Sequence, residues 1–312
     1  MFSRRHSRKI VRILVVITLM VILLAILPGC GGEATPTTSP AISPSPTDVA
    51  PLPATPRLRV ATTTSLYDTG LWGYLEPMFE ERYNVELDIL YTGSGQALEY
   101  GRRGDVDVLT VHDKPNELKF ISDNYGVERV PFAYNYFLIV GPASDPARIR
   151  GMTPVDAFKK LMENGTGIFV SRGDNSGTHS MEKRIWQLAG YEYEAVENAG
   201  DWYVQSGSGM GPTLQIANEK LGYTLADMGT HIAFKSDLDL VPIVDKGDIL
   251  LNVYSAIAVN PEKVTVAKNL AMAKNLVAFL TEPGIQELIG KYGFAEYGLQ
   301  LFTPCAGNEP TS

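Results

Sequence analysis

Three short segments rich in serine, threonine and glycine carry the groups that can hold an anion. They are residues 62–65, 92–95 and 171–178, and each follows a predicted strand and precedes a predicted helix. The first turn of a helix has unpaired N–H groups and a partial positive charge, hydroxyls add further donors, and glycine lets the backbone approach a ligand closely. A single such segment is commonly only a helix cap, but three in one chain indicate an anion site.

The third of these segments also contains a cation. Arg172 offers a fixed fork of charged N–H donors, which suits an oxyanion. Asp174 follows two residues later. We expect its carboxylate to orient Arg172, although a carboxylate at this place could also simply favour the start of the helix.

Strands and helices alternate along the chain from Leu58 onward. The segments Leu58–Ala61, Val85–Tyr91 and Val106–Val111 are typical of strands, and helical apolar spacing lies between them. This order predicts βαβ units and mainly parallel sheets flanked by helices. Ligands of such sheets bind at the carboxyl ends of the strands, where the three polar segments are expected to lie.

Two extended segments lie between stretches that resemble complete α/β units, namely Tyr136–Gly141 and Val253–Val259. Two such crossovers would join two lobes and act as a hinge, with the ligand in the cleft between them. We therefore expect an α/β protein with lobe 1 formed by residues 57–136 and 256–312 and lobe 2 by residues 137–255.

The first 56 residues have a different composition. Five basic residues precede an apolar run from Ile13 to Leu27, which is the pattern of a secretory signal. The sequence Leu27-Pro28-Gly29-Cys30 resembles a bacterial lipobox, which implies a signal peptide over 1–29 and a lipidated Cys30, followed by a Pro/Thr/Ser-rich tether over 30–56. An uncleaved membrane anchor is the alternative. Both place the remainder outside the cytoplasm and attached to the membrane.

The net charge and the positions of cysteine and histidine argue against a nucleic-acid-binding protein, a disulfide-rich protein and a metalloprotein. Removing residues 1–29 takes away five of the 27 basic residues and none of the 35 acidic ones, so the remainder has a net charge of −13, which argues against nucleic acid as a partner. Cys305 has no partner if Cys30 is lipidated, which excludes a disulfide framework. The histidines at 112, 179 and 231 lack metal-site spacing, so we expect neither a metal nor a cofactor.

Residues 62–65 and 171–179 resemble the two signature segments of tungstate-binding proteins from ABC-type importers. The resemblance extends from about Leu58 to the last helix. It implies a type II periplasmic-binding-protein fold, tungstate as the ligand, an ABC permease as the partner and no enzyme activity; we expect a monomer. Ser94 is added from its loop position alone. The candidate ligand-binding residues are Thr63, Thr64, Ser65, Ser94, Arg172, Ser176, Gly177 and Thr178.

Phosphate is the main alternative ligand. Residues 172–178 also resemble the Arg-x-Asp-x-Ser-Gly-Thr loop of phosphate-binding proteins. Phosphate keeps a proton at neutral pH and needs an acceptor in its site, whereas tungstate is fully deprotonated and is repelled by a buried carboxylate. Asp113 decides between the two. Because residues 113–116 are typical of a turn, we expect Asp113 to point to solvent, which favours tungstate or molybdate.

Two further functions remain open at this stage. The chain could be an oxyanion-sensing lipoprotein that serves no permease. It could also be a hydrolase of phosphate esters, which would need a nucleophile with a base or two metal ions. The chain has few histidines and no evident carboxylate cluster, so this alternative is the weaker one. Tungstate and molybdate have nearly the same size and charge, and the sequence does not separate them.

Overall fold

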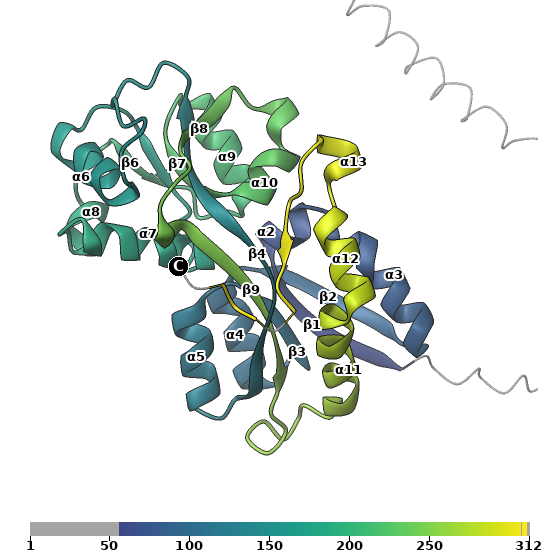
Figure 1. Cartoon of the computed structure of the whole chain (residues 1–312). Coiled ribbons are helices and arrows are strands. Elements are labelled where there is room, and N and C mark those ends of the chain that lie inside the picture. Colours follow the sequence, from purple (N-terminus) through teal and green to yellow (C-terminus); the bar gives the residue numbers. More distant parts are fainter. Residues whose placement is uncertain (1–55, 307, 311–312) are drawn as a thin grey trace, which may run out of the picture. The chain divides into compact units, whose positions relative to one another are not determined.

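The computed structural model describes residues 56–306 and 308–310. The described residues belong to one compact unit. The predicted signal peptide, Cys30 and nearly all of the predicted tether lie outside the described residues. Figure 1 shows two groups of helices and strands in this unit, joined by the long strands β4 and β9. We call the group that begins with β1 lobe 1 and the group that contains β5 to β8 lobe 2.

Lobe 1 contains a parallel arrangement of three strands. The strand β1 lies between β2 and β3 and pairs with both in parallel. Thr63 is level with Thr92, and Thr62 is level with Thr110, so the carboxyl ends of all three strands lie at one edge of the sheet. The bounds are β1 (Arg57–Thr63), β2 (Glu86–Thr92) and β3 (Val108–Val111).

Helices cover this sheet and bury its apolar side chains. One core contains Trp72, Phe79 and Leu276, and a second contains Leu98 and Phe120. Burial of such side chains provides most of the stability of the lobe. The helices are α2 (Thr64–Asp68), α3 (Leu71–Tyr83), α4 (Ser94–Arg103), α5 (Lys114–Ser122), α11 (Leu270–Thr281), α12 (Pro283–Lys291) and α13 (Phe294–Tyr297).

Lobe 2 is built around aromatic side chains. Phe158, Phe169 and Trp186 pack together in its larger core. Thr153 caps the helix that begins at Pro154, since its Oγ1 accepts the N–H of Asp156 at 3.1 Å. The elements are α6 (Pro154–Asn164), β5 (Phe169–Ser171), α7 (Gly177–Leu188), α8 (Tyr193–Glu197), β6 (Tyr203–Gln205), α9 (Met210–Glu219), β7 (Thr224–Asp227), α10 (Met228–Ala233), η1 (Lys235–Asp237), β8 (Leu240–Val244) and η2 (Asp248–Leu250).

Two long strands pass from one lobe to the other. They are β4 (Gly126–Pro142) and β9 (Leu251–Val259), and they pair antiparallel from Gly126 and Val259 to Tyr136 and Leu251. The first part of β4 also pairs with β10 (Thr303–Pro304), while its second part pairs with β7 and β8. β9 pairs with β3 on its other side. The α/β class and the two extended crossovers are thus confirmed.

β4 begins ten residues before the strand predicted from the sequence. The early part contains Pro131 and Asn135, which interrupt the apolar pattern, and pairing with β9 overrides that local signal. The predicted lobe boundaries lie inside β4 and β9 and stay a prediction.

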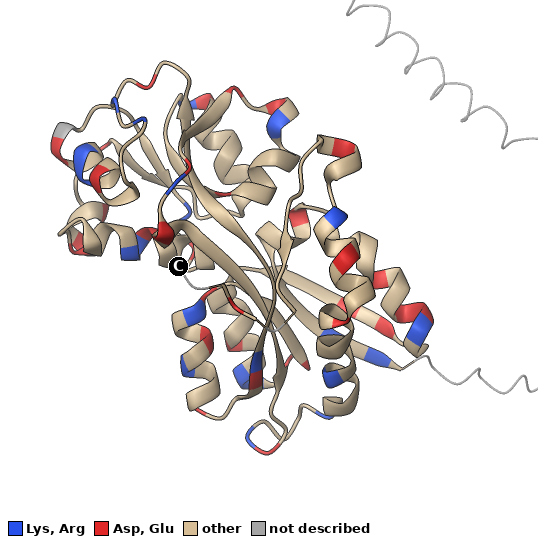
Figure 2. Ribbon diagram, in the orientation of Figure 1, with Lys and Arg blue, Asp and Glu red and all other residues tan. Residues whose placement is uncertain are grey.

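Charged side chains lie mainly on the outer helices of both lobes. Figure 2 shows acidic and basic residues interspersed there, with the strands between them mostly uncharged. Among the helices that the structure describes, none has the length and apolar character needed to cross a membrane.

Candidate anion-binding site

The first hydroxyl-rich segment forms the turn from β1 into α2. Thr63 caps the short helix, because its Oγ1 accepts the N–H of Leu66 at 3.3 Å. The same oxygen lies 3.2 Å from Ser65 Oγ, and Ser65 Oγ lies 3.0 Å from His112 Nε2. Thr63 and Ser65 are buried. The segment is therefore held in place by neutral groups of lobe 1.

Hydrogen bonds from neighbouring elements fix the end of β1, the strand that leads into this turn. Thr62 Oγ1 accepts hydrogen bonds from Trp72 Nε1 at 2.8 Å and from Thr110 Oγ1 at 2.9 Å. Ser94, at the start of α4, is buried and its Oγ accepts the N–H of His112 at 3.4 Å. These contacts bring the carboxyl ends of β1, β2 and β3 together, as parallel-strand geometry predicts.

The segment in lobe 2 forms the turn from β5 into α7. Ser176 caps α7 and accepts the N–H of His179 at 3.2 Å. Asp174 receives the N–H of Ser176 on Oδ1 at 3.1 Å and Arg172 Nη2 on Oδ2 at 2.5 Å. The contact expected between Asp174 and Arg172 is thus present, and a carboxylate fixes the arginine fork.

The segments from the two lobes meet each other. Arg172 Nη2 donates to Thr64 Oγ1 at 3.2 Å, and the N–H of Gly95 donates to the carbonyl of Asn175 at 3.3 Å. A Cβ atom added at Gly177 would lie 2.5 Å from the carbonyl oxygen of His112. Only glycine fits this close approach, so the start of α7 lies directly against the end of β3.

Two buried donors of the lobe 2 segment have no hydrogen-bond partner in the described structure. They are Arg172 Nε and Thr178 Oγ1, and both residues are almost fully buried, with 2% and 0% of their surface exposed. An unpartnered buried donor is costly, and such atoms are commonly paired by a ligand. The donor set fits a deprotonated oxyanion.

His112 is a site residue that the sequence interpretation did not select. Burial lowers the pKa of its imidazole, so the ring is neutral at neutral pH. Its Nδ1 is buried without a partner. His112 directly follows β3, so the rule that selected the other segments, polar residues at the carboxyl ends of strands, could have found it.

Thr230 also joins the lobes. Its Oγ1 lies 3.2 Å from the carbonyl oxygen of Ser65. Thr230 belongs to α10, which is capped by Asp227, and Asp227 accepts hydrogen bonds from Asn252 and Tyr254 on β9. The turn of lobe 1 is therefore linked through lobe 2 to one of the crossover strands.

The prediction that Asp113 points to solvent is wrong. Only 3% of its surface is exposed. Its Oδ2 accepts hydrogen bonds from Ser180 of α7 at 2.7 Å and from Asn116 at 2.8 Å, while Oδ1 is buried without a partner. Residues 114–122 form α5 rather than a turn, because Pro115 in the first turn of a helix is favourable. The packing of α7 against α5 then covers Asp113.

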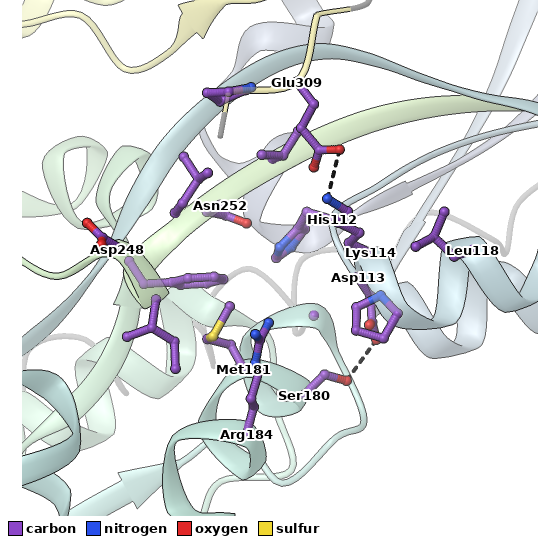
Figure 3. Close-up of a pocket in the computed structure, with 17 residues that line it drawn as sticks. His112, Asp113, Lys114, Leu118, Ser180, Met181, Arg184, Asp248, Asn252 and Glu309 are labelled. Atoms are coloured by element: carbon purple, nitrogen blue, oxygen red, sulfur yellow. Dashed lines mark hydrogen bonds and ion pairs between the residues drawn. The ribbon is translucent and has the colours of Figure 1, made fainter. Parts of the chain in front are cut away.

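A cavity of about 720 Å³ lies beside these segments, between α5, α7 and β9 (Figure 3). Of the eight predicted ligand-binding residues, only Gly177 lines it. Figure 3 shows two polar contacts among the residues that line the cavity. Ser180 points toward Asp113, and Lys114 points toward Glu309. Many of the side chains that line the cavity are apolar. They include Phe137, Met181, Leu118, Ile249, Leu251 and Val253. Within residues 56–306 and 308–310, no group of three or more His, Cys, Asp and Glu is placed to hold a metal ion.

Comparison with known proteins identifies the family. Residues 37–283 match the model of the PBP superfamily domain. The chain is 40% identical over 298 residues to the tungstate-binding protein TupA of Peptoclostridium acidaminophilum, covering 95% of this chain and 99% of that protein. It is 44% identical over 262 residues to a putative ABC transporter anion-binding protein of Haloferax volcanii, covering 82% of this chain and 74% of that protein.

Solved structures agree with these relatives. The tungstate-binding protein TupA from Desulfovibrio alaskensis G20 is 40% identical, with a TM-score of 0.66 over 80% of this chain and 98% of that one. The tungstate ABC transporter protein from Geobacter sulfurreducens is 43% identical, with a TM-score of 0.66 over 76% of this chain and 98% of that one. These relatives are binding proteins of transport systems and not enzymes. The chain therefore belongs to the type II periplasmic-binding-protein family of solute-binding proteins that includes the tungstate-binding proteins of ABC importers.

Proposed function

We propose that the protein captures tungstate between its two lobes. The observation that carries the proposal is the pair of buried, unpartnered donors, Arg172 Nε and Thr178 Oγ1, in a segment that meets the hydroxyl-rich turn of lobe 1. An anion held there would receive charged donation from Arg172 and neutral donation from hydroxyls and backbone N–H groups. The relatives named for tungstate support this ligand.

Eight residues are proposed to form the site. Lobe 1 contributes neutral hydroxyls at the ends of its strands, and lobe 2 contributes the arginine and the start of α7. Because the groups come from both lobes, an anion that contacts all of them would stabilise the closed arrangement over an open one. The proposed residues are Thr63, Thr64, Ser65, Ser94, Arg172, Ser176, Gly177 and Thr178.

The closed, anion-bound protein is proposed to deliver its ligand to an ABC permease outside the cytoplasm. In this proposal the signal peptide is removed, Cys30 carries a lipid, and the tether up to residue 56 holds the monomeric two-lobed unit at the membrane. The relatives that work in ABC transport systems support the transport role. Metabolic labelling with a radioactive fatty acid in cells, compared between the wild type and Cys30→Ala, tests the anchor.

Phosphate remains a second candidate because of one observation, the buried carboxylate of Asp113 with its unpartnered Oδ1. A protonated phosphate could donate to that oxygen. However, the hydrogen bonds of Asp113 run to Ser180 and Asn116 and not to any of the eight proposed residues. Asp113→Asn should therefore leave tungstate affinity within about twofold, and a large loss of phosphate binding in this variant would favour phosphate instead.

Isothermal titration with tungstate, molybdate, sulfate and phosphate, followed by competition, tests the ligand. We expect tight tungstate binding that excess phosphate does not displace. Molybdate is expected to compete, because its size and charge nearly match those of tungstate. Tight binding of phosphate without a response to tungstate would contradict the proposal. The absence of detectable binding with all four anions would also contradict it.

A further inference from the structure

A buried carboxylate of lobe 2 lies behind the segment that carries Arg172. Glu182 belongs to α7, and only 1% of its surface is exposed. Its Oε2 accepts Ser171 Oγ at 2.6 Å, and its Oε1 accepts Trp186 Nε1 at 3.1 Å and Tyr203 Oη at 2.6 Å. The Trp186 indole can only donate, and the ionised carboxylate is the form that accepts all three hydrogen bonds.

A second connection leads from Glu182 to the other end of the same segment. The N–H of Asn175 donates to His179 Nδ1 at 2.9 Å. Burial lowers the pKa of His179 to about 4, so the ring is neutral and its single proton is on Nε2. Nε2 therefore donates to Tyr193 Oη at 2.6 Å. Tyr193 then donates to Tyr203 at 2.7 Å, and Tyr203 donates to Glu182, so every hydrogen bond in the chain has one direction.

The two connections hold the segment 171–175 from both sides. Ser171 Oγ, which donates to Glu182, also accepts the N–H of Gly173 at 3.1 Å. Asn175 is held through the histidine and the two tyrosines. Arg172 and Asp174 lie between these points, and Thr178 follows on α7.

We infer that Glu182 is a positioning residue for anion binding, which acts through Ser171 and through the Tyr203–Tyr193–His179 chain to fix the backbone that carries Arg172. The inference rests on the proposed function, since it assigns a role at the proposed site. The side-chain hydrogen bonds of Glu182 run to Ser171, Trp186 and Tyr203 and to none of the eight proposed residues. A carboxylate placed in this way can align donors without facing the anion.

The positioning role depends on the charge of Glu182. Burial raises the pKa of Glu182 to about 7, against the hydrogen bonds that lower it. Three titratable groups lie near the carboxylate of Glu182. They are Tyr203 on β6, Tyr193 on α8, which contacts Tyr203, and Lys183 on α7. Protonation would place an O–H among three donors, so at least one hydrogen bond would be lost or reversed. Anion binding should therefore weaken as the pH falls through 7.

Glu182→Gln tests the inference by isothermal titration with sodium tungstate. At pH 8 we expect affinity about tenfold weaker, which corresponds to the loss of one hydrogen bond to a charged group. Between pH 8.5 and 6.5 the wild type should lose affinity, whereas the variant should show a flat profile. Glu117→Gln is the matched control, because burial also raises the pKa of Glu117 to about 7, but its side chain contacts Arg129, Ser255 and the N–H of Asp113.

A double-variant cycle separates positioning from general damage to the fold. Because both variants break the same Glu182–Ser171 hydrogen bond, Glu182→Gln combined with Ser171→Ala should lose less affinity than the sum of the two single losses. Additive losses, or a Glu182→Gln variant with wild-type affinity and the wild-type pH profile, would overturn the inference.

Amide hydrogen exchange of the ligand-free protein tests the positioning role independently of tungstate binding, and therefore independently of the proposed function. The N–H groups of Gly173 and Asn175 should exchange faster in Glu182→Gln than in the wild type and in Glu117→Gln. Unchanged exchange at both amides would contradict the positioning role. If the wild type binds no tungstate, the proposed function fails, but the exchange measurement still decides whether Glu182 holds the segment.

Discussion

The two segments that face each other across the lobes are held in different ways. The turn of lobe 1 is fixed by neutral partners, namely His112 for Ser65 and Trp72 for the strand that precedes it. The segment of lobe 2 is fixed by two carboxylates, Asp174 on Arg172 and Glu182 on Ser171. Charged partners form stronger and more directional hydrogen bonds than neutral ones.

This difference assigns different roles to the two lobes. Lobe 2 supplies the one arginine of the candidate site together with the groups that orient it, so it should determine most of the affinity for a dianion. Lobe 1 supplies hydroxyls whose individual contributions are smaller but whose positions determine the size of the site. The difference predicts a ranked set of effects on anion binding.

The largest effect is expected for Arg172→Ala. The variant removes the charged donor and leaves Asp174 without its charged partner, so tungstate affinity should fall by about 100-fold or more. Isothermal titration measures it. Arg184→Ala is the control, because this arginine lies on α7, which follows the segment of Arg172, but lines the neighbouring cavity. Equal losses in the two variants would mean that the binding depends on the general positive charge of this region and not on the guanidinium of Arg172.

A smaller effect is expected for Arg172→Lys. Lysine keeps the charge but lacks the planar guanidinium, in which Nη2 donates to Asp174 and Thr64 while Nε is left for the anion, so affinity should fall by about tenfold. Isothermal titration of both proteins with tungstate gives the ratio of the affinity of Arg172→Lys to that of the wild type. Wild-type affinity would show that only the charge matters.

Ser65→Ala probes the neutral turn of lobe 1. Loss of one neutral hydrogen bond predicts affinity about fivefold weaker, and the thermal midpoint should also fall slightly because His112 Nε2 loses its partner. Ser122→Ala, an exposed serine on α5, is the control for both measurements. A loss as large as that of Arg172→Ala would contradict the division between the lobes.

The smallest effect on affinity is expected for Glu117→Gln, within about twofold. Its effect on stability should depend on pH. Folding raises the pKa of Glu117 to about 7 from 4.5, so its contribution to the free energy of unfolding is complete below pH 4.5 and is lost as the pH rises through 7. Urea unfolding should show the advantage of the wild type over the variant shrinking by roughly 1–3 kcal/mol between pH 5 and 8.

The sequence predicted those parts of the site that depend on local rules. Hydroxyls after strands and before helices led to residues 62–65 and 171–178, and the structure brings these segments together. The start of β4 and the burial of Asp113 were missed, because both depend on distant partners, β9 and Ser180. The network of Glu182 was missed for the same reason, since Tyr203 and Ser171 are far from it in sequence.

Anomalous diffraction from a crystal grown with tungstate tests the central claim most directly, because the tungsten atom marks the position of the anion. We predict one strong peak between the turn at residues 63–65 and the segment 172–178, within hydrogen-bonding reach of Arg172 and Thr178. A peak in the cavity lined by Asp113, Arg184 and Glu309, or no peak at saturating tungstate, would contradict the assignment of the site.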